Sequence, residues 1–344
     1  MPLSRLLERT IKAVFHGKQG RVSPKSRPCP GISERFLSVI IFRPPETERK
    51  LADKGTYWPH AMKSRLLPHI VSCLIVAANL ASFNLLAAES ATDLLARAGT
   101  EFQRGAVKEA EELANQAIKA EPTNPRGYMM RAMLFESKGE WAKAVSDFSE
   151  VLKLKPDESA VWQHRGSDQF RLGKIKESIA DFDKFLELKP DEAPYHWQRG
   201  ISLYYAKRYE DGQKQFESHK TVNPNDVENA VWHYICVAKV AGVEKARESF
   251  IGIERDRRVP MMQIHAMFAE KTKPEAVLAA LGEGEPKTAE DKMAHFYAHL
   301  YIGLYYEAQG KAELAKKHID LAAEKYSGPD YMGDVARVHS KLLK

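Results

Sequence analysis

Cysteine is scarce in this chain of 344 residues, where only Cys29, Cys73 and Cys236 occur. Cleavage near Ala88, for which the signal is described below, would leave Cys236 alone, and a single cysteine cannot form an internal disulfide. The sequence also lacks the GxxxxGK[ST] loop that binds nucleotide phosphates and the GxSxG turn that presents a hydrolase serine. We therefore expect a protein that is not an enzyme and that binds no cofactor.

Excess positive charge is missing from most of the chain, although the formal net charge is +6. Residues 1–88 hold 14 of the 52 Lys and Arg residues and 5 of the 46 Asp and Glu residues. The remaining 38 basic and 41 acidic residues give residues 89–344 a net charge of −3. Nucleic-acid binding needs a basic stripe on the folded part, so we expect no nucleic-acid partner.

The front of the chain resembles a targeting segment that starts late. Residues 1–61 show no helical or strand period and contain several prolines among scattered basic residues, which predicts disorder. Met62 is then followed by two basic residues, by the apolar run 70–86 and by the small Ala87 and Ala88. This order is typical of a secretory signal peptide. We expect residues 62–88 to be the signal, Met62 to be the true start, and residues 1–61 not to be made.

The alternative for this segment is a retained membrane anchor. The apolar run 70–86 is nearly as long as the roughly 20 residues that cross a bilayer. It is diluted by polar residues such as Asn79 and Asn84, and no basic stop-transfer cluster follows it. Cleavage predicts an exported protein, periplasmic or secreted. Retention predicts anchoring in the inner membrane through residues 70–86, and only then would the protein contact a membrane.

A period of 34 residues organises the chain after residue 90. The repeated positions are turn glycines and helix-ending prolines, namely Gly105, Gly139 and Gly173 and then Pro122, Pro156, Pro190 and Pro224. Between them, apolar residues recur at helical spacing, as in Ile175, Ile179, Phe182 and Leu186. Glycine tolerates a positive φ in a tight turn, and proline, which lacks an N–H, ends the second helix. Each unit is therefore predicted to be a hairpin of two short antiparallel helices.

One such hairpin cannot bury its own apolar stripe, so neighbouring hairpins must stack and share a core. The sequence thus predicts an all-α solenoid with a concave inner face. We expect four units over residues 91–224, degenerate helical hairpins over 225–292, and a further unit with a C-terminal capping helix over 293–344. Polar residues near the end, such as Arg337, His339 and Lys341, suit a capping role.

The period and its residue types resemble the tetratricopeptide repeat (TPR) family. The third unit carries the pattern in Trp162, Gly166, Gly173, Phe182 and Pro190. Small residues share one slot in each unit, where the two helices should pass closest: Ala98, Ala132, Gly166 and Gly200. The fourth unit departs from the pattern at its turn, where Lys207 stands in place of glycine.

The order of signal, repeats, degenerate middle and final unit is similar to that of bacterial envelope TPR proteins. One such group, the outer-membrane TPR lipoproteins, consists of adaptors that tether envelope proteases and cell-wall hydrolases. This resemblance implies a non-catalytic scaffold that binds a partner protein, as a peptide or helix, in the concave groove. The chain departs from the lipoprotein pattern because no lipid-carrying cysteine follows its apolar run.

The first helix of each unit should line the groove, because this helix faces the concave side in the resembled family. The predicted partner-binding residues are Met129, Met133, Glu136, Gln163, Phe170, Arg171, Trp197, Ile201, Tyr204 and Tyr205. Methionine and aromatic side chains suit the burial of apolar anchors from a partner. The alternative is that some of these side chains pack between hairpins. If they line the groove, Trp197→Ala and Tyr204→Ala should weaken partner capture without loss of helix.

Two further readings of the sequence remain open. The tyrosines of the last unit, Tyr301, Tyr305 and Tyr306, could form a patch through which copies of a structural protein associate. His295 and His299 stand four residues apart on one helix face, as zinc ligands can, but they lack a third ligand and have aromatic neighbours. We therefore predict packing and no metal there. Paired carboxylates such as Asp181 and Asp183 are expected on solvated faces, and Cys236 in a helix core.

Overall fold

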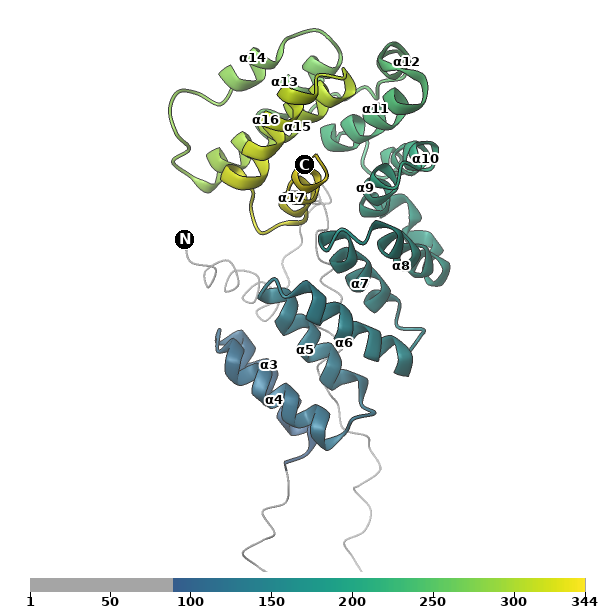
Figure 1. The fold of residues 1–344 in the computed structure, drawn as a ribbon, viewed down its shortest axis with the longest axis vertical. Coiled ribbons are helices and arrows are strands. Elements are labelled where there is room, and N and C mark those ends of the chain that lie inside the picture. The colour runs from purple at the N-terminus through teal and green to yellow at the C-terminus, as the bar shows by residue number, and fades with distance from the viewer. Residues whose placement is uncertain (1–88, 344) are drawn as a thin grey trace, which may run out of the picture. The chain divides into compact units, whose positions relative to one another are not determined.

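The computed structural model describes residues 89–343, and every regular element in this part of the chain is a helix (Figure 1). The helices of the four predicted units are α3 (Ala91–Gln103), α4 (Val107–Ala120), α5 (Pro125–Ser137), α6 (Trp141–Leu154), α7 (Ser159–Arg171), α8 (Ile175–Leu188), the short η3 (Pro190–Tyr195), α9 (Trp197–Tyr205) and α10 (Tyr209–Lys220). They are followed by α11 (Val227–Ala241), α12 (Val243–Glu248), α13 (Met261–Phe268), α14 (Pro274–Ala279), α15 (Ala289–Ala308), α16 (Ala312–Asp320), η4 (Leu321–Tyr326) and α17 (Tyr331–Leu342). The predicted all-α solenoid of stacked hairpins is confirmed.

The turns inside the hairpins repeat one backbone conformation. Gly105, Gly139 and Gly173 have φ values of 81°, 71° and 74°. Lys207, which takes the glycine position in the fourth unit, has a φ of 59°. A side chain with a Cβ is disfavoured in this left-handed region by roughly 1–2 kcal/mol. The fourth hairpin therefore keeps the turn of the other three at a cost in conformational energy.

The small-residue slot lies where the two helices of a hairpin touch. Ala98 and Ala132 are fully buried there. A Cβ added to Gly166 would lie 2.8 Å from the ring of Phe182, closer than carbon atoms pack. The close approach predicted from the sequence is confirmed, and any larger residue would push the two helices apart.

In two successive hairpins, a buried ion pair at the same repeat positions joins the first helix of the hairpin to the second. The guanidinium of Arg131 donates to both carboxylate oxygens of Asp147 over 2.7 Å. Arg165 pairs with Asp181 in the same two-pronged way over 2.8 Å. Asp181 is only 4% exposed, so the expectation of a solvated carboxylate at this position is wrong. Such paired hydrogen bonds fix both distance and orientation, and here they repeat every 34 residues.

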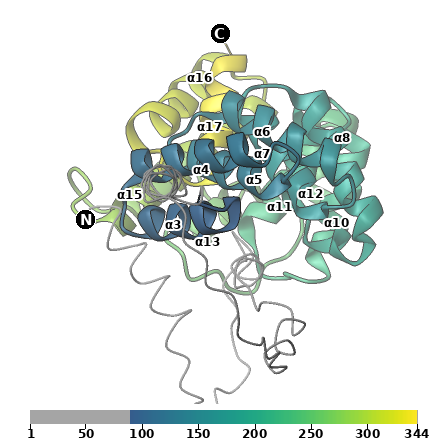
Figure 2. The same cartoon turned by 90° about the horizontal axis from the view of Figure 1, so that it is seen from below.

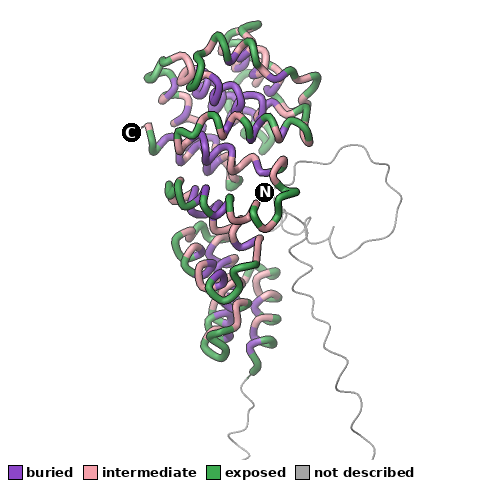
Figure 3. The backbone as a smooth tube through the Cα atoms, turned by 90° about the vertical axis from the view of Figure 1, so that its right-hand side faces the viewer, coloured by how far each residue is buried: buried purple, intermediate pink, exposed green. Residues whose placement is uncertain are grey.

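The second half of the chain contains the larger core. Its buried side chains come mainly from α11, α13, α15 and α17, and they include Trp232, Tyr234 and Cys236. Burial raises the pKa of the Cys236 thiol, which keeps it neutral. Figure 3 shows the buried positions, in purple, more densely in this half than in the first hairpins. Between residues 89 and 343, no helix combines the length and apolar character needed to cross a bilayer.

The last helix, α17, packs against two distant parts of the solenoid. It contacts η4 and α16, which directly precede it, and also α7 of the third unit. Figures 1 and 2 show it, in yellow, on the inner side of the stacked hairpins. A helix that only capped the end of the array would not reach α7, so α17 also occupies part of the inner face.

Candidate functional site

The inner face of the solenoid is formed by the first helix of each hairpin, α3, α5, α7 and α9. Seven of the predicted groove residues are partly exposed: Met129, Met133, Glu136, Gln163, Arg171, Trp197 and Tyr205. The other three, Phe170, Ile201 and Tyr204, are 0%, 1% and 5% exposed. The prediction that these three line an open groove is wrong, because the protein itself covers them.

The covering element over α7 is α17. Nε of Arg171 donates to Oδ2 of Asp334 over 2.7 Å. The ring of Tyr331 stacks on Phe170, with ring centroids 5.4 Å apart, and meets Trp197 edge-on at 5.3 Å. Residues predicted to hold a partner segment thus hold a helix of the same chain.

The same helix reaches α9 through a histidine. The hydroxyl of Tyr205 lies 2.9 Å from Nδ1 of His339, and Nε2 of His339 lies 2.9 Å from Oε2 of Glu307 on α15. Glu307 also accepts from the Tyr204 hydroxyl over 2.8 Å and pairs with Lys239 at 3.0 Å. Burial acts to raise the pKa of Glu307, but its hydrogen bonds and these cations outweigh burial and lower the pKa to about 2. Glu307 is thus a charged centre that joins α9, α11, α15 and α17.

A second buried ionic cluster lies between α5, α7 and α17. Arg171 donates from Nη1 to Oδ1 of Asp168 over 2.7 Å as well as to Asp334, so one guanidinium serves two carboxylates. Asp168 is fully buried, and its Oδ2 has no hydrogen-bond partner. Burial first, and then the negative charge of Glu136, raise the pKa of Asp168 to about 8. The Asp168 carboxyl is therefore harder to ionise than an exposed aspartate, despite its contact with Arg171.

His164 connects this cluster to α5. Its Nδ1 lies 3.0 Å from Oε1 of Glu136. Burial acts to lower the pKa of His164, but the Glu136 carboxylate outweighs it and raises the pKa. Glu136 is therefore occupied by a contact within the protein, and only part of it faces solvent.

The inner face of α3 and α5 remains partly exposed. Leu95, Phe102, Met129 and Met133 each keep some solvent contact. Leu95 and Met129 stand at the repeat position of Trp197, and Phe102 stands at that of Phe170; Tyr331 of α17 covers both of these rings farther along the solenoid. We call these four residues the open strip. It is apolar, and its two methionines can adapt to the shape of a ligand.

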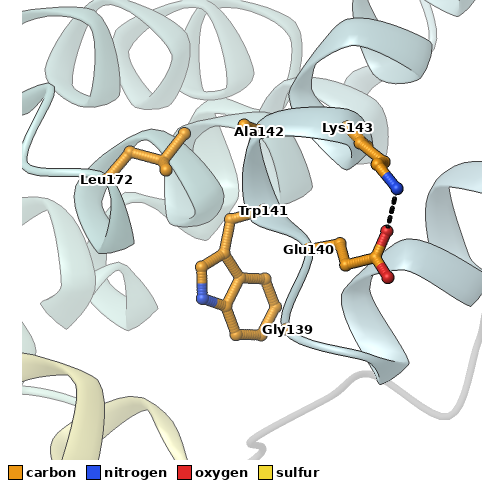
Figure 4. Close-up of a pocket in the computed structure, with 6 residues that line it drawn as sticks. All are labelled: Gly139, Glu140, Trp141, Ala142, Lys143 and Leu172. Carbon is orange, nitrogen blue, oxygen red and sulfur yellow. Dashed lines mark ion pairs between the residues drawn. The ribbon is translucent and has the colours of Figure 1, made fainter.

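A shallow hollow adjoins the turn between α5 and α6 (Figure 4). Its volume is about 330 Å³, and it is lined by Gly139, Glu140, Trp141, Ala142, Lys143 and Leu172. The guanidinium of Arg171 lies 4.4 Å from the Trp141 ring centroid, so Trp141 links this hollow to the buried cluster. The only ion pair drawn among its lining residues joins Lys143 to Glu140 at 2.6 Å.

The histidines considered as metal ligands are packed among rings. His295 and His299 are each 9% exposed, and both lie against Tyr326. Nδ1 of His299 lies 2.9 Å from Nδ1 of His318, and burial followed by the charge of neighbouring groups lowers the pKa of His299 to about 4. Over residues 89–343, no three His, Cys, Asp or Glu side chains are arranged to hold a metal ion.

The tyrosine patch considered for self-association is largely internal. Tyr301 is fully buried and donates to Glu228 over 2.6 Å, and Tyr305 is 9% exposed. Only Tyr306 keeps appreciable solvent contact. The prediction of an exposed patch formed by all three is wrong, because α15 is surrounded by α11, α13 and α16.

Sequence reasoning missed the residues through which α17 binds the inner face. Tyr331, Asp334 and His339 stand in a segment with ordinary helical amphipathicity, and nothing in their spacing points to α7 or α9. The nearest signal is the carboxylate of Asp334. A buried acid needs a basic partner, and Arg171 was already predicted to lie on the inner face.

Comparison with known proteins agrees with this architecture. Residues 82–160 and 159–192 match sequence profiles of the tetratricopeptide repeat. The fold is similar to a tetratricopeptide repeat protein from Parabacteroides merdae, at 19% identity and a TM-score of 0.51, over 74% of this chain and 98% of that one. The chain thus belongs to the class of helical-hairpin solenoids. Its sequence similarity to the tetratricopeptide repeat covers residues 82–192.

Two other solved structures are more distant. YrrB, described as a TPR protein with an unusual peptide-binding site, is 15% identical, with a TM-score of 0.46 over 56% of this chain and 91% of that one. MamA is 12% identical, with a TM-score of 0.44 over 53% of this chain and 92% of that one. No curated protein sequence matches the chain significantly.

Proposed function

We propose that this protein is a non-catalytic scaffold that captures a segment of a partner protein on its inner face. The observation that carries the proposal is the open strip of Leu95, Phe102, Met129 and Met133, which is apolar and partly exposed. Each hairpin is held by its neighbours, so the strip is formed before a partner arrives. A preformed surface binds with little loss of conformational entropy.

The partner segment should be short and apolar. The strip spans the first helices of two hairpins, and the α17-covered part of the inner face bounds it on one side. Soft thioether and aromatic side chains favour a helix or an extended peptide with one or two large apolar anchors. Glu136, at the same end, is paired with His164 and offers the partner little charge.

A photo-crosslinker placed in the native cell tests this proposal. It replaces Met133 on the open strip and, in a matched control, Gln116, which is exposed on α4. We expect one partner to be captured at position 133 and not at position 116. Met133→Lys should abolish binding of that partner in a pull-down, whereas Gln116→Lys should not. Equal capture at both positions, or binding that survives Met133→Lys, would contradict the proposal.

We also propose that the protein is exported to the bacterial envelope. The support is the order of basic, apolar and small residues over 62–88, which lie outside the described residues, as do residues 1–61. The N-terminal sequence of the native protein checks this proposal, and we expect it to begin close to residue 89. A native protein that begins at Met1, or that keeps residues 70–86, would contradict cleavage.

A further inference from the structure

The inner face of α7 and α9 already holds a helix, and the details of that contact define what the face recognises. Tyr331, Asp334 and His339 of α17 supply the contacts to it. With about 100° between successive residues, these three positions fall on one side of the helix. On the inner face, the rings of Phe170 and Trp197 contact Tyr331. The Arg171 guanidinium binds Asp334, and the Tyr205 phenol lies beside His339.

A different set of contacts attaches α17 to the end of its own chain. Arg337 donates to the Ser327 hydroxyl over 2.7 Å, and the Ser340 hydroxyl donates to Asp320 over 2.6 Å. Gly333 lies against the backbone of Gly328, where an added Cβ would overlap the Gly328 carbonyl oxygen. Apart from Asp334, which also accepts from Nη2 of Arg337 over 2.7 Å, the side chains that contact the inner face differ from those that attach α17 to η4 and α16.

The inner face contains a buried guanidinium, that of Arg171, whose second carboxylate partner comes from α17. Arg171 is shared between Asp168 and Asp334, and the second oxygen of Asp168 has no partner. Asp334 is the carboxylate that the helix on this face supplies to Arg171, at 2.7 Å from its Nε. A buried guanidinium that loses one of its two carboxylate partners is costly, so the face favours a helix that supplies a carboxylate.

We infer that the inner face of α7 and α9 is a helix-binding surface, that α17 is its resident ligand, and that a partner helix with the same pattern can take its place. That pattern is an aromatic residue, a carboxylate three positions later and a histidine five positions after that. The inference goes beyond the scaffold proposal, which concerns the open strip on α3 and α5. Continuity with the interface that α17 already forms supports the choice of occupant.

A variant of the full chain tests the inference. Ten Gly and Ser residues inserted after Gly328 would let α17 leave the face while it stays attached, and flexible insertions of this size are tolerated. The probe is a fluorescent peptide of residues 329–343. We expect it to bind the insertion variant at least tenfold more tightly than the unmodified chain. Asp334→Ala in the peptide should weaken binding at least tenfold, whereas Lys341→Ala, at an exposed position, should not.

Three results would overturn the inference. The first is a folded insertion variant that does not bind the peptide, and the second is equal binding of the Asp334→Ala and Lys341→Ala peptides. The third is dimers of the insertion variant that exchange α17, which would make a second copy the occupant in place of a foreign helix. Loss of binding after Met133→Lys would point to the open strip instead, so failure here is distinguishable from failure of the scaffold proposal.

A measurement on the uninserted chain keeps the inference testable if the insertion prevents folding. In the Asp334→Ala variant, backbone amides of α17 should exchange with solvent at least tenfold faster, while those of α3 to α6 keep their rates. Unchanged exchange in α17 would show that the face does not hold the helix and would contradict the inference.

Discussion

Arg171 and Asp334 stand 163 positions apart in the sequence, yet Nε of the first donates to Oδ2 of the second over 2.7 Å. Their side chains are 16% and 8% exposed. The pair joins the third repeat to the last helix in a setting where neither charge is well hydrated. This contact separates the inner face into a covered part, on α7 and α9, and the open strip.

Breaking this pair from one side should destabilise the protein strongly. We expect Arg171→Met, which removes the cation shared by Asp168 and Asp334 and leaves Asp334 with Arg337 alone, to lower the free energy of unfolding by about 3 kcal/mol. The double variant Arg171→Met with Asp334→Ala should lose clearly less than the sum of the two single variants. Urea unfolding of the four proteins measures the coupling. Strict additivity would show that the two side chains do not interact.

The turn at Lys207 offers a stabilising change. Lys207→Gly should raise the free energy of unfolding by about 1 kcal/mol, because glycine adopts the observed φ of 59° without strain. The matched control is Gly173→Ala at the equivalent turn, where an added Cβ would meet nothing within 4 Å. It should destabilise by a similar amount for conformational reasons alone. Thermal or urea unfolding checks both, and a destabilised Lys207→Gly would contradict the explanation.

His196 should make the fold sensitive to mild acid. Its Nδ1 accepts from the backbone N–H of Arg199 over 3.2 Å and so caps α9. Burial first, and then the charge of Arg199, lower the pKa of His196 from 6.5 to about 3. Below pH 6.5 the unfolded chain takes up a proton here, and the folded chain does not until pH falls to about 3. Stability from this group is therefore complete above pH 6.5 and is lost as pH falls.

We expect about 2 kcal/mol of this stability to be lost between pH 7 and pH 5. His196→Asn keeps a side-chain oxygen for the cap and removes the titration. Other buried histidines titrate in both proteins, so the measured quantity is the difference in pH dependence between the variant and the wild type. Parallel stability curves over this pH range would contradict a neutral, buried His196.

Alanine substitutions on the inner face should lower the stability of the protein strongly at buried positions and weakly at exposed ones. Tyr204 is 5% exposed and donates to Glu307, so Tyr204→Ala should cost about 3–5 kcal/mol of stability. Met133 is partly exposed, so Met133→Ala should cost less than about 1 kcal/mol. This corrects the expectation that Tyr204→Ala would affect only partner capture. Differential scanning calorimetry measures both, and equal effects would contradict the assignment of the two positions.

The hairpins could be predicted from the sequence because their determinants are local. Turn glycines, the small-residue slot and helical apolar spacing recur every 34 residues, and each acts between side chains of one hairpin or its neighbour. The Arg131–Asp147 type of pair was missed for a different reason. A carboxylate on a helix looks the same in sequence whether it faces water or a guanidinium 16 positions earlier.

The covering of the inner face could not be predicted in this way. Phe170, Ile201 and Tyr204 occupy groove-facing positions of the repeat but are buried. Phe170 is covered by Tyr331 of α17, and Tyr204 by Trp232 of α11 and Glu307 of α15. The place of α17 depends on the path of the chain through α11 to η4, where the period weakens. A repeat pattern predicts how neighbours stack, but it carries no information on which distant segment returns to the array.

The return of α17 also changes how the solenoid should come apart. In an array whose units touch only their neighbours, terminal hairpins can fray while the middle stays folded. Here the contact between Arg171 and Asp334 joins residues that stand 163 positions apart. The last helix, α17, therefore cannot detach without breaking its contact with the third unit. Everything from α7 to α17 should therefore melt as one cooperative block, and only α3 to α6 remain free to unravel separately.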